Sequence, residues 1–476
     1  MKLVYQVKDK PPFGKTLVFA LQQLLAILAA TIAVPAIVGN GMSQSAALFG
    51  AGVGTFVYLL FTKFRSPVFL GSSFAFLGSM AAAFAGGVSM SVGYLGLIIG
   101  AGFAGLVYVV IALIVKKAGV NWLNKLMPAV VIGPTVAIIG LSLAGNAVSD
   151  MMKGGLQVNN SPVCNTYVAL LCALVTLFTV VACSVYGKKM AKMIPFIIGI
   201  VAGYAVAAIF TGIGYAAKVD ALKVIDFTKF KNMQWYPDFA FIEAFKGNYV
   251  YGAGGSFGTY LLTIFVAYAP VAFVVFAEHV ADHKNLSSII EHDLLTDPGL
   301  DKTLLGDGIG SIVGAFFGGC PNTTYGESVG CVAISGNASV VTIFTTAIMA
   351  IVISFFAPFV TFLATIPNCV MGGVCMTLYG FIAVSGLKMI QKVDLENNKN
   401  LFVVSVILIA GIGGFTLTFG KVTITSIACA LILGILTNVL CSIGGKKEAE
   451  VEGVTAEDAT IAESMETSEN DENKAE

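Results

Sequence analysis

The stretch Pro321-Asn322-Thr323-Thr324-Tyr325-Gly326-Glu327 interrupts a chain that is otherwise almost continuously apolar from Leu17 to Ile443. It puts turn-forming residues and a carboxylate where lipid would surround a regular helix, and unpaired amides lose water there without regaining hydrogen bonds. Such an interruption is tolerated only inside protein or beside a water-filled cavity, where it marks a substrate or ion site. This heptapeptide is therefore the first candidate for a functional site.

The composition is that of a polytopic membrane protein. Of the 476 residues, 57% are hydrophobic and 11% are charged, and the mean hydropathy is +0.87, whereas soluble chains average roughly 25% charged residues. With 27 basic and 27 acidic residues the formal net charge is zero, so the charge balance predicts no nucleic-acid partner. The nine Cys show no paired metal-ligand spacing, and we expect neither a metal nor another cofactor.

Apolar runs near the roughly 20 residues that cross a bilayer predict fourteen transmembrane segments. They lie near 15–37, 44–61, 67–87, 91–115, 127–148, 163–186, 193–215, 255–281, 303–320, 321–334, 338–365, 367–389, 400–416 and 421–443. All Lys and Arg clusters then fall on one side, which predicts a cell-membrane protein with both termini in the cytoplasm. The loop 216–252 would be extracytoplasmic and divides the segments seven and seven, while 446–476 has the acidic, polar composition of a disordered tail.

An internal repeat links the two halves. Leu48–Val57 matches Leu304–Val313 in every Gly, and about twenty residues after each copy comes a polar, helix-breaking stretch, Gly71–Phe76 and then Pro321–Glu327. Because seven segments is an odd number, two such halves have opposite topology. Inverted repeats with broken helices at matching positions predict a secondary transporter with its site near the midplane and the two breaks facing each other. The same repeat reappears where Met127-Pro128 with Gly133 is echoed by Ile366-Pro367 with Gly372.

Two carboxyls lie in the apolar region beside a break or its neighbouring helix, Glu278 and Glu327. A carboxyl in a span costs roughly 2.5–3.5 kcal/mol on insertion scales, so its presence indicates a function. For Glu278 the sequence leaves a second reading open, a carboxylate at a cytoplasmic helix end, because His279, Asp282, His283 and Lys284 follow at once. Glu327 has no such alternative.

The groups near the breaks favour one class of ligand. Backbone N–H donors at two helix N-termini, carboxyl acceptors, and Phe74 and Tyr325 as walls suit a flat, neutral heterocycle with both N–H and C=O groups. An inorganic anion would require Arg or Lys, and neither occurs near either break. Buried carboxyls can also exchange protons, with His279 and His283 either relaying them or simply solvated. A zinc site of His279, Asp282 and His283 is disfavoured because the spacing spreads them over different helix faces.

Longer motifs carry a resemblance to a known family. They are Gly71-Ser72-Ser73-Phe74-Ala75-Phe76, Ala277-Glu278-His279, Asp293-Leu294-Leu295 with Asp297-Pro298-Gly299-Leu300, Pro321 to Glu327 with Gly330, and Val370-Met371-Gly372-Gly373. Over nearly its whole length the chain resembles the nucleobase-ascorbate transporter (nucleobase:cation symporter-2) family, and Pro-Asn-Thr-Thr-Tyr-Gly-Glu is typical of its uracil-permease branch.

The resemblance implies an all-α fold of fourteen spans in two inverted repeats, with short strands in the broken spans 3 and 10. It implies a cytoplasmic N-terminus (1–14), a core domain (15–115 and 253–365) and a gate domain (127–215 and 366–445). Substrate contacts would come from Glu278, Glu327, the Gly326 amide, Ser73 and the Phe74 backbone, with the rings of Phe74 and Tyr325 packed around the base.

One departure concerns the coupling ion. Members of the family often have a His four positions after the first site Glu, and here Asp282 occupies that position, with His283 next to it. Gln23 likewise stands where a His can occur. Whether Asp282, His283 or neither of them carries the coupling proton is therefore open, and Glu278 is a further candidate.

The function expected from the resemblance is uracil import by proton symport with alternating access, and not an enzymatic activity. Sodium is the less favoured coupling ion, and a homodimer through the gate domain is expected. The alternatives are a symporter for xanthine or another base, and, from other classes, a passive channel or a membrane-embedded hydrolase.

Overall fold

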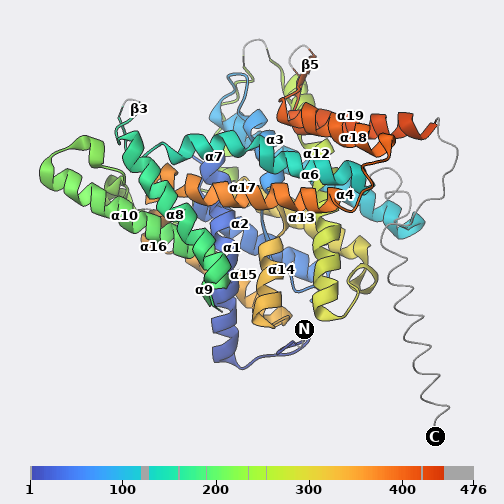
Figure 1. Ribbon diagram of the computed structural model, residues 1–476, viewed down its shortest axis with the longest axis horizontal. Helices are drawn as coiled ribbons and strands as arrows, with labels where there is room; N and C mark the ends of the chain where they lie inside the picture. The colour runs from blue at the N-terminus through green and yellow to red at the C-terminus, as the bar shows by residue number, and fades with distance from the viewer. Residues whose placement is uncertain are drawn as a thin grey trace, which may run out of the picture.

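The computed structural model describes residues 3–119, 128–158, 161–188, 190–233, 235–252, 255–419 and 422–443, and it is dominated by helices (Figure 1). The elements of the first half are α1 (Phe13–Val38), α2 (Gln44–Phe61), β1 (Leu70–Ser72), η1 (Phe74–Phe76), α3 (Leu77–Ala83), α4 (Met90–Ala118), α6 (Ala129–Ser142), α7 (Ala144–Met151), β2 (Gln157–Val158), β3 (Ser161–Pro162), α8 (Thr166–Tyr186), α9 (Met190–Met193), α10 (Pro195–Ala217), η2 (Asp220–Leu222), η3 (Phe227–Asn232) and α11 (Ala240–Ala244). Those of the second half are α12 (Phe257–Ile290), η4 (Leu295–Gly299), α13 (Leu300–Gly318), β4 (Asn322–Thr324), α14 (Gly326–Ser335), α15 (Val340–Ile353), α16 (Ala357–Thr365), α17 (Asn368–Ile390), α18 (Asn398–Ile412), β5 (Leu417–Phe419), β6 (Val422–Ile424) and α19 (Ser426–Ile443). The predicted acidic tail, 446–476, lies outside the described residues.

The helices agree with a polytopic membrane protein. Within the described ranges, eight helices are long and apolar enough to cross a bilayer, and the pair α15–α16 would make a ninth. That pair differs from the single span predicted at 338–365, because it bends by 83°. Pro358 lies in the first turn of α16. Because Pro has no backbone N–H to donate, it fits the first turn of a new helix better than the interior of a continuous one. The total of fourteen spans stays a prediction.

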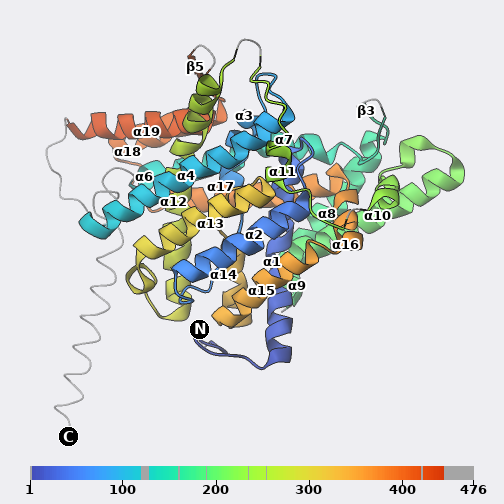
Figure 2. The same cartoon turned by 180° about the vertical axis from the view of Figure 1, so that it is seen from behind.

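The repeated glycine motif packs against its own copy. A Cβ atom at Gly54 of α2 would lie 2.7 Å from the Gly310 carbonyl oxygen of α13, and one at Gly310 would lie 2.8 Å from the Gly54 oxygen. Only a residue without a side chain allows two helix backbones to come this close. Together with α1, α4, α12 and α15, these two helices form one connected group of packed helices, of which α2, α4, α13 and α15 lie in front in Figure 2.

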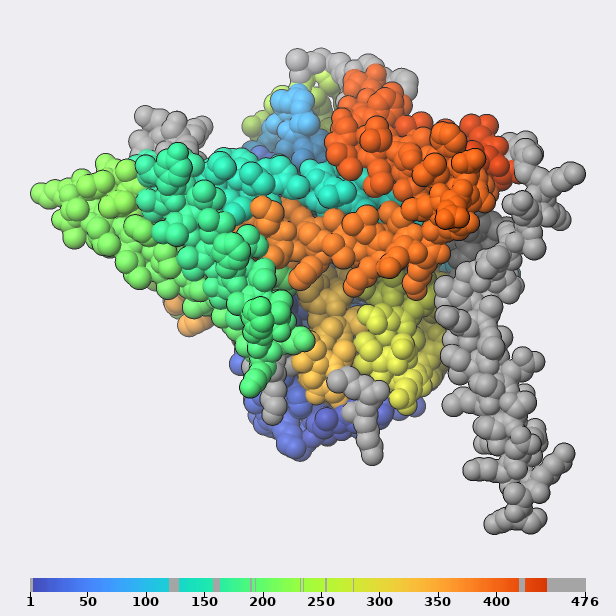
Figure 3. Space-filling view, viewed as in Figure 1, coloured from blue at the N-terminus to red at the C-terminus, as the bar shows by residue number. Residues whose placement is uncertain are grey.

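A second group contains α6, α7, α8, α10, α17, α18 and α19, and α17 runs across the face shown in Figure 3. The echo between Pro128 and Pro367 is structural, because both residues precede the first turn of a helix, α6 and α17, and these two helices pack on each other. Gly386 of α17 lies so close to the backbone of α6 that a Cβ there would overlap Ala137. The assignment of the two groups as core and gate domains stays a prediction.

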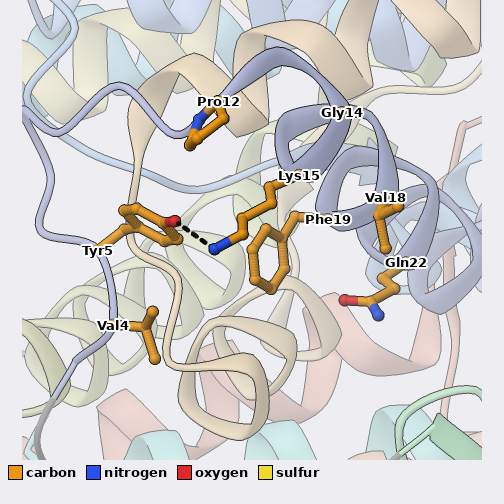
Figure 4. Close-up of a pocket in the computed structure, with 8 residues that line it drawn as sticks. All are labelled: Val4, Tyr5, Pro12, Gly14, Lys15, Val18, Phe19 and Gln22. Atoms are coloured by element: carbon orange, nitrogen blue, oxygen red, sulfur yellow. Dashed lines mark hydrogen bonds between the residues drawn. The ribbon is translucent and has the colours of Figure 1, made fainter.

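The N-terminal segment runs back over the end of α14. The amide of Val4 donates to the Gly336 carbonyl at 2.7 Å, and the amide of Ala338 donates to the Tyr5 carbonyl at 2.9 Å. Between this segment and α1 lies a cavity of about 610 Å³, into which Tyr5, Lys15 and Phe19 point (Figure 4). This cavity is lined by Val4, Tyr5, Pro12, Gly14, Lys15, Val18, Phe19 and Gln22, and none of the predicted site residues is among them.

Candidate functional site

The two helix-breaking stretches meet as an antiparallel pair of strands. β1 and β4 pair with Leu70 opposite Thr324, Gly71 opposite Thr323 and Ser72 opposite Asn322. The ladder continues beyond the strands, since the Ser73 amide donates to the Pro321 carbonyl at 2.9 Å. The backbone groups that face each other across the pair are thus satisfied by the other break, and neighbouring side chains satisfy others, since the Leu70 amide donates to the Thr55 hydroxyl at 2.9 Å. The predicted strands and their face-to-face arrangement are confirmed.

A half-helix leaves each strand. η1 and α3 begin at Phe74, α14 begins at Gly326, and neither start has a side-chain hydrogen bond that caps it. The first N–H groups of a helix carry a partial positive charge and lack intrahelical acceptors. Gly326 is exposed although Tyr325 before it is buried. The junction therefore presents donors from the backbone alone.

Three carboxyls surround this junction. Glu327 lies in the first turn of α14, and Glu278 is half-buried on α12, with no hydrogen bond to another described residue. Asp282, one turn further along α12, accepts a hydrogen bond from the Thr324 hydroxyl at 2.7 Å, and a Cβ at position 326 would lie 3.7 Å from its Oδ1. Because α12 continues to Ile290, about three turns beyond Glu278, the reading of Glu278 as a helix-end carboxylate is wrong.

The aromatic residues at the junction have different surroundings. The ring of Phe74 meets the ring of Tyr379 on α17 edge to face, with centroids 6.0 Å apart, so it lies where the two helix groups meet. Tyr325 is 4% exposed, its ring covers Gly71, and its hydroxyl donates to the Ser72 carbonyl at 2.8 Å. The hydroxyl of Ser73 is buried without a described hydrogen-bond partner. The contact of Tyr325 and Ser73 with a ligand stays a prediction.

The structure separates the residues that the sequence offered for proton coupling. Asp282 lies at the junction, whereas His283 lies on another face of α12, with its Nε2 2.7 Å from the Tyr58 hydroxyl and its Nδ1 2.8 Å from the His279 carbonyl. His279 lies beside His283 on that same face. Among the described residues no group of three or more His, Cys, Asp or Glu side chains is arranged to hold a metal ion.

Sequence reasoning overlooked Ser328, Tyr379 and Asp307, and it named Gln23 only as a departure from the family's pattern. Gln23 of α1 donates to the Ser328 hydroxyl at 2.5 Å, and that oxygen also accepts from the Phe69 amide at 3.0 Å, which joins α1 and both breaks. Nothing in the local sequence of Ser328 or Tyr379 indicated these contacts. Asp307 is different, because it is an ionisable residue inside an apolar segment, where Ala51 stands in the other copy of the repeat.

These features define the class of the protein. A bundle of apolar helices in which two half-helices meet beside half-buried carboxyls is the architecture of a secondary transporter. The chain matches the profile of the Permease family (Xan_ur_permease) over residues 14–420, and it belongs to this family. It is a multi-pass membrane transporter and not an enzyme.

Several curated relatives are similar along almost their whole length. The chain is 38% identical to the uracil permease of Bacillus caldolyticus, covering 92% of this chain and 95% of the relative. It is 36% identical to the uracil permease of Bacillus subtilis (strain 168), covering 93% and 96%, and 34% identical to that of Escherichia coli (strain K12), covering 96% and 98%.

Solved transporters share the fold. The murine Solute Carrier 26 family member A9 anion transporter, in its inward-facing state, superposes with a TM-score of 0.62 at 12% identity, over 92% of this chain and 69% of that one. The transmembrane domain of a cyanobacterial bicarbonate transporter, BicA, gives a TM-score of 0.56 at 18% identity, over 92% and 100%. At these identities the likeness shows the fold alone, and it confirms the predicted helical, polytopic fold class.

Proposed function

We propose that this chain imports uracil by proton symport. Relatives at 34–38% identity are uracil permeases, and the junction offers the chemistry that uracil requires. Uracil is a flat, neutral ring with two N–H donors and two carbonyl acceptors. The observation that carries the proposal is the half-buried carboxyl of Glu278, which has no described hydrogen-bond partner and lies on α12, the helix that packs on both η1 and α14.

Each group at the junction has a proposed role. Glu278 and Glu327 accept hydrogen bonds from the ring N–H groups, while the Gly326 amide and the Phe74 backbone donate to its carbonyls. Hydrogen bonds to a charged acceptor contribute roughly 1.5–3 kcal/mol each, enough to select a ring that carries N–H groups in the right places. Phe74 and Tyr325 pack around the ring, and Ser73 supplies a further hydroxyl.

Proton coupling is assigned to the carboxyls at the junction. Asp282 touches the second break through Thr324 and lies within one turn of Glu278, which supports Asp282 and Glu278 over His283 as the proton carriers. A proton bound beside the substrate changes the relative affinity of the outward and inward states, which is what coupling requires. Sodium is the alternative ion.

Alternating access is proposed as a movement of the core domain against the gate domain. The edge-to-face contact of Phe74 with Tyr379 joins the two helix groups directly at the junction, so a relative movement opens or closes the substrate space. We place the protein in the cell membrane with both termini in the cytoplasm, and expect a homodimer through the gate domain.

Uptake by proteoliposomes tests the function. An imposed inward proton gradient is expected to drive accumulation of labelled uracil, a sodium gradient is not, and a protonophore abolishes it. Glu278→Gln is expected to reduce uptake at least tenfold, because it replaces a charged acceptor by a neutral amide. Glu291→Gln is the matched control, since Glu291 is exposed just after the last turn of the same helix.

Three results would contradict the proposal. Full uptake by Glu278→Gln removes Glu278 from the site. Competition in which unlabelled xanthine displaces labelled uracil better than uracil itself makes the protein a purine symporter. Flux that never exceeds equilibrium and ignores the proton gradient makes it a passive channel.

A further inference from the structure

A second polar cluster is buried on the neighbouring face of α12, about 100° around the helix from Glu278. It consists of His279 and His283 on α12, Thr303 and Asp307 on α13, Tyr58 at the end of α2, and Ser66 just after it. Each of the six residues is at most 1% exposed. None of them takes part in the proposed contacts with substrate, although such a cluster is costly to bury in a membrane protein.

His279 is held at both ring nitrogens. Its Nδ1 is 2.8 Å from Asp307 Oδ2, and its Nε2 is 3.0 Å from the Thr303 hydroxyl. Thr303 and Asp307 are one turn apart on α13, so the imidazole is fixed against two consecutive turns of that helix. The other Asp307 oxygen, Oδ1, is buried without a described partner, which leaves His279 as the residue that compensates this carboxyl.

The helix that carries Thr303 and Asp307, α13, is closely packed, and at one position it differs from its repeat partner α2. α13 packs on α2 through their glycines, with backbone atoms too close to admit a side chain. The repeat places Ala51 where α13 has Asp307, and Ala51 is fully buried as well. Close packing of the two helices therefore does not require a carboxyl at this position. Because the carboxyl of Asp307 occurs in the second repeat alone, we expect it to have a role in that repeat, which also contains α12.

Glu278 has no such support of its own. Its carboxyl makes no hydrogen bond to another described residue, and α12 contains Pro270 about two turns earlier, where the helix loses a backbone hydrogen bond. Successive helical residues point about 100° apart, so the rotation of α12 that fixes His279 also determines where Glu278 points. An anchor at residue 279 thus acts directly on residue 278.

We propose that the buried pair of His279 and Asp307 is a positioning device that sets the rotation of α12 and thereby aims the Glu278 carboxyl at the ligand. This inference rests on the proposed role of Glu278 in binding uracil. His279 and Asp307 touch no substrate, so they act on affinity through Glu278. Their loss is expected to impair recognition more than turnover.

The test compares uracil affinity, transport KM and maximal rate in Asp307→Asn and in the wild type. Asp307→Asn is expected to raise the Kd and KM for uracil roughly tenfold, the equivalent of one charge-assisted hydrogen bond, while the maximal rate per folded protein stays within about twofold. Binding of the two N-methylated uracils adds a second readout. One of these analogues lacks the N–H group that Glu278 would bind. Asp307→Asn is expected to bind that analogue almost as well as the wild type does, so the preference for uracil over the analogue is smaller in the variant.

Tyr58→Phe is the matched control, because it removes two other buried hydrogen bonds of the same cluster, to Ser66 and to His283, which is one turn away from His279. It is expected to keep the wild-type KM. If the Asp307→Asn protein is not produced in folded form, Thr303→Val replaces it in the test. This substitution removes only the hydrogen-bond partner of His279 Nε2, and it is expected to raise KM severalfold.

The outcomes separate this inference from the proposed function. A wild-type protein that binds no uracil contradicts the function itself. An unchanged Kd in the variant, a loss confined to protein amount or maximal rate, or equal losses for uracil and both analogues would overturn the positioning role alone.

Discussion

The substitution Ser328→Ala tests whether the two breaks are held together by side chains as well as by their strands. The Ser328 hydroxyl accepts hydrogen bonds from the Phe69 amide at 3.0 Å and from the Gln23 amide group at 2.5 Å. All three residues are at most 3% exposed, so water is not available to replace the lost oxygen. The change would leave the Phe69 N–H without this acceptor, while Gln23 retains the Ser328 carbonyl at 3.3 Å.

The expected cost follows from these partners. A buried donor left unsatisfied costs roughly 1–3 kcal/mol, and the weakened Gln23 contact adds a further fraction. We therefore expect Ser328→Ala to lower the free energy of unfolding by about 1–4 kcal/mol. Because Ser328 follows Glu327 directly, uracil affinity should decrease as well.

The assay is reversible unfolding in mixed micelles together with equilibrium uracil binding. Ser335→Ala is the control in the same helix, since among the described residues the half-buried Ser335 hydroxyl hydrogen-bonds only to neighbouring backbone groups, the Val332 carbonyl and the Asn337 amide. It should change the free energy of unfolding by less than about 0.5 kcal/mol. Equal effects of the two substitutions, or a loss below about 1 kcal/mol for Ser328→Ala, would refute the reasoning.

Two further predictions concern helix packing and a surface ion pair. Gly54→Ala should destabilise the protein by about 1–3 kcal/mol, because its Cβ would lie 2.7 Å from the Gly310 carbonyl oxygen. Gly102→Ala on α4 is the control, since that position has open space around it, and it should be neutral or stabilising by up to about 1 kcal/mol. Unfolding in micelles measures both variants, and similar effects would contradict the packing argument. The hydrogen bond from the Arg65 guanidinium, at 2.5 Å, lowers the pKa of Asp297. The pair therefore stabilises the folded protein fully at a pH above the ordinary pKa of Asp, about 3.9. This contribution is lost as the pH falls through the lowered pKa of the folded protein. The stability difference between the wild type and Asp297→Asn should therefore shrink as the pH is lowered from 7 to 3, and a constant difference would show that the pair contributes no pH dependence.

Much of the architecture followed from local sequence. Long apolar runs predicted membrane helices, and the positions of Pro128 and Pro367 matched the starts of α6 and α17. The repeated Gly motif predicted that α2 and α13 are equivalent, and their packing against each other is the physical reason for the glycines. The bend between α15 and α16 was missed because an apolar run is equally compatible with a straight and a bent helix.

The site was only partly predictable. Glu278 and Glu327 were identifiable because a carboxyl in an apolar segment is costly wherever the helix points. The choice between Asp282 and His283 was not, since adjacent residues point about 100° apart and the sequence does not say which face of α12 turns toward the second break. Tyr379 and Ser328 join the site through contacts between segments far apart in the chain, and their neighbours in sequence give no sign of it.

The amino-acid sequence by itself determined that the chain crosses a membrane many times, that its two halves repeat, and that each half contains a broken helix with polar groups. These properties depend on the cost of transferring individual side chains and amides into lipid, which each residue type carries with it. The tertiary structure decided the rest, because it sets directions in space. It paired β1 with β4, turned Asp282 toward Thr324, and buried His279 against Asp307 of α13.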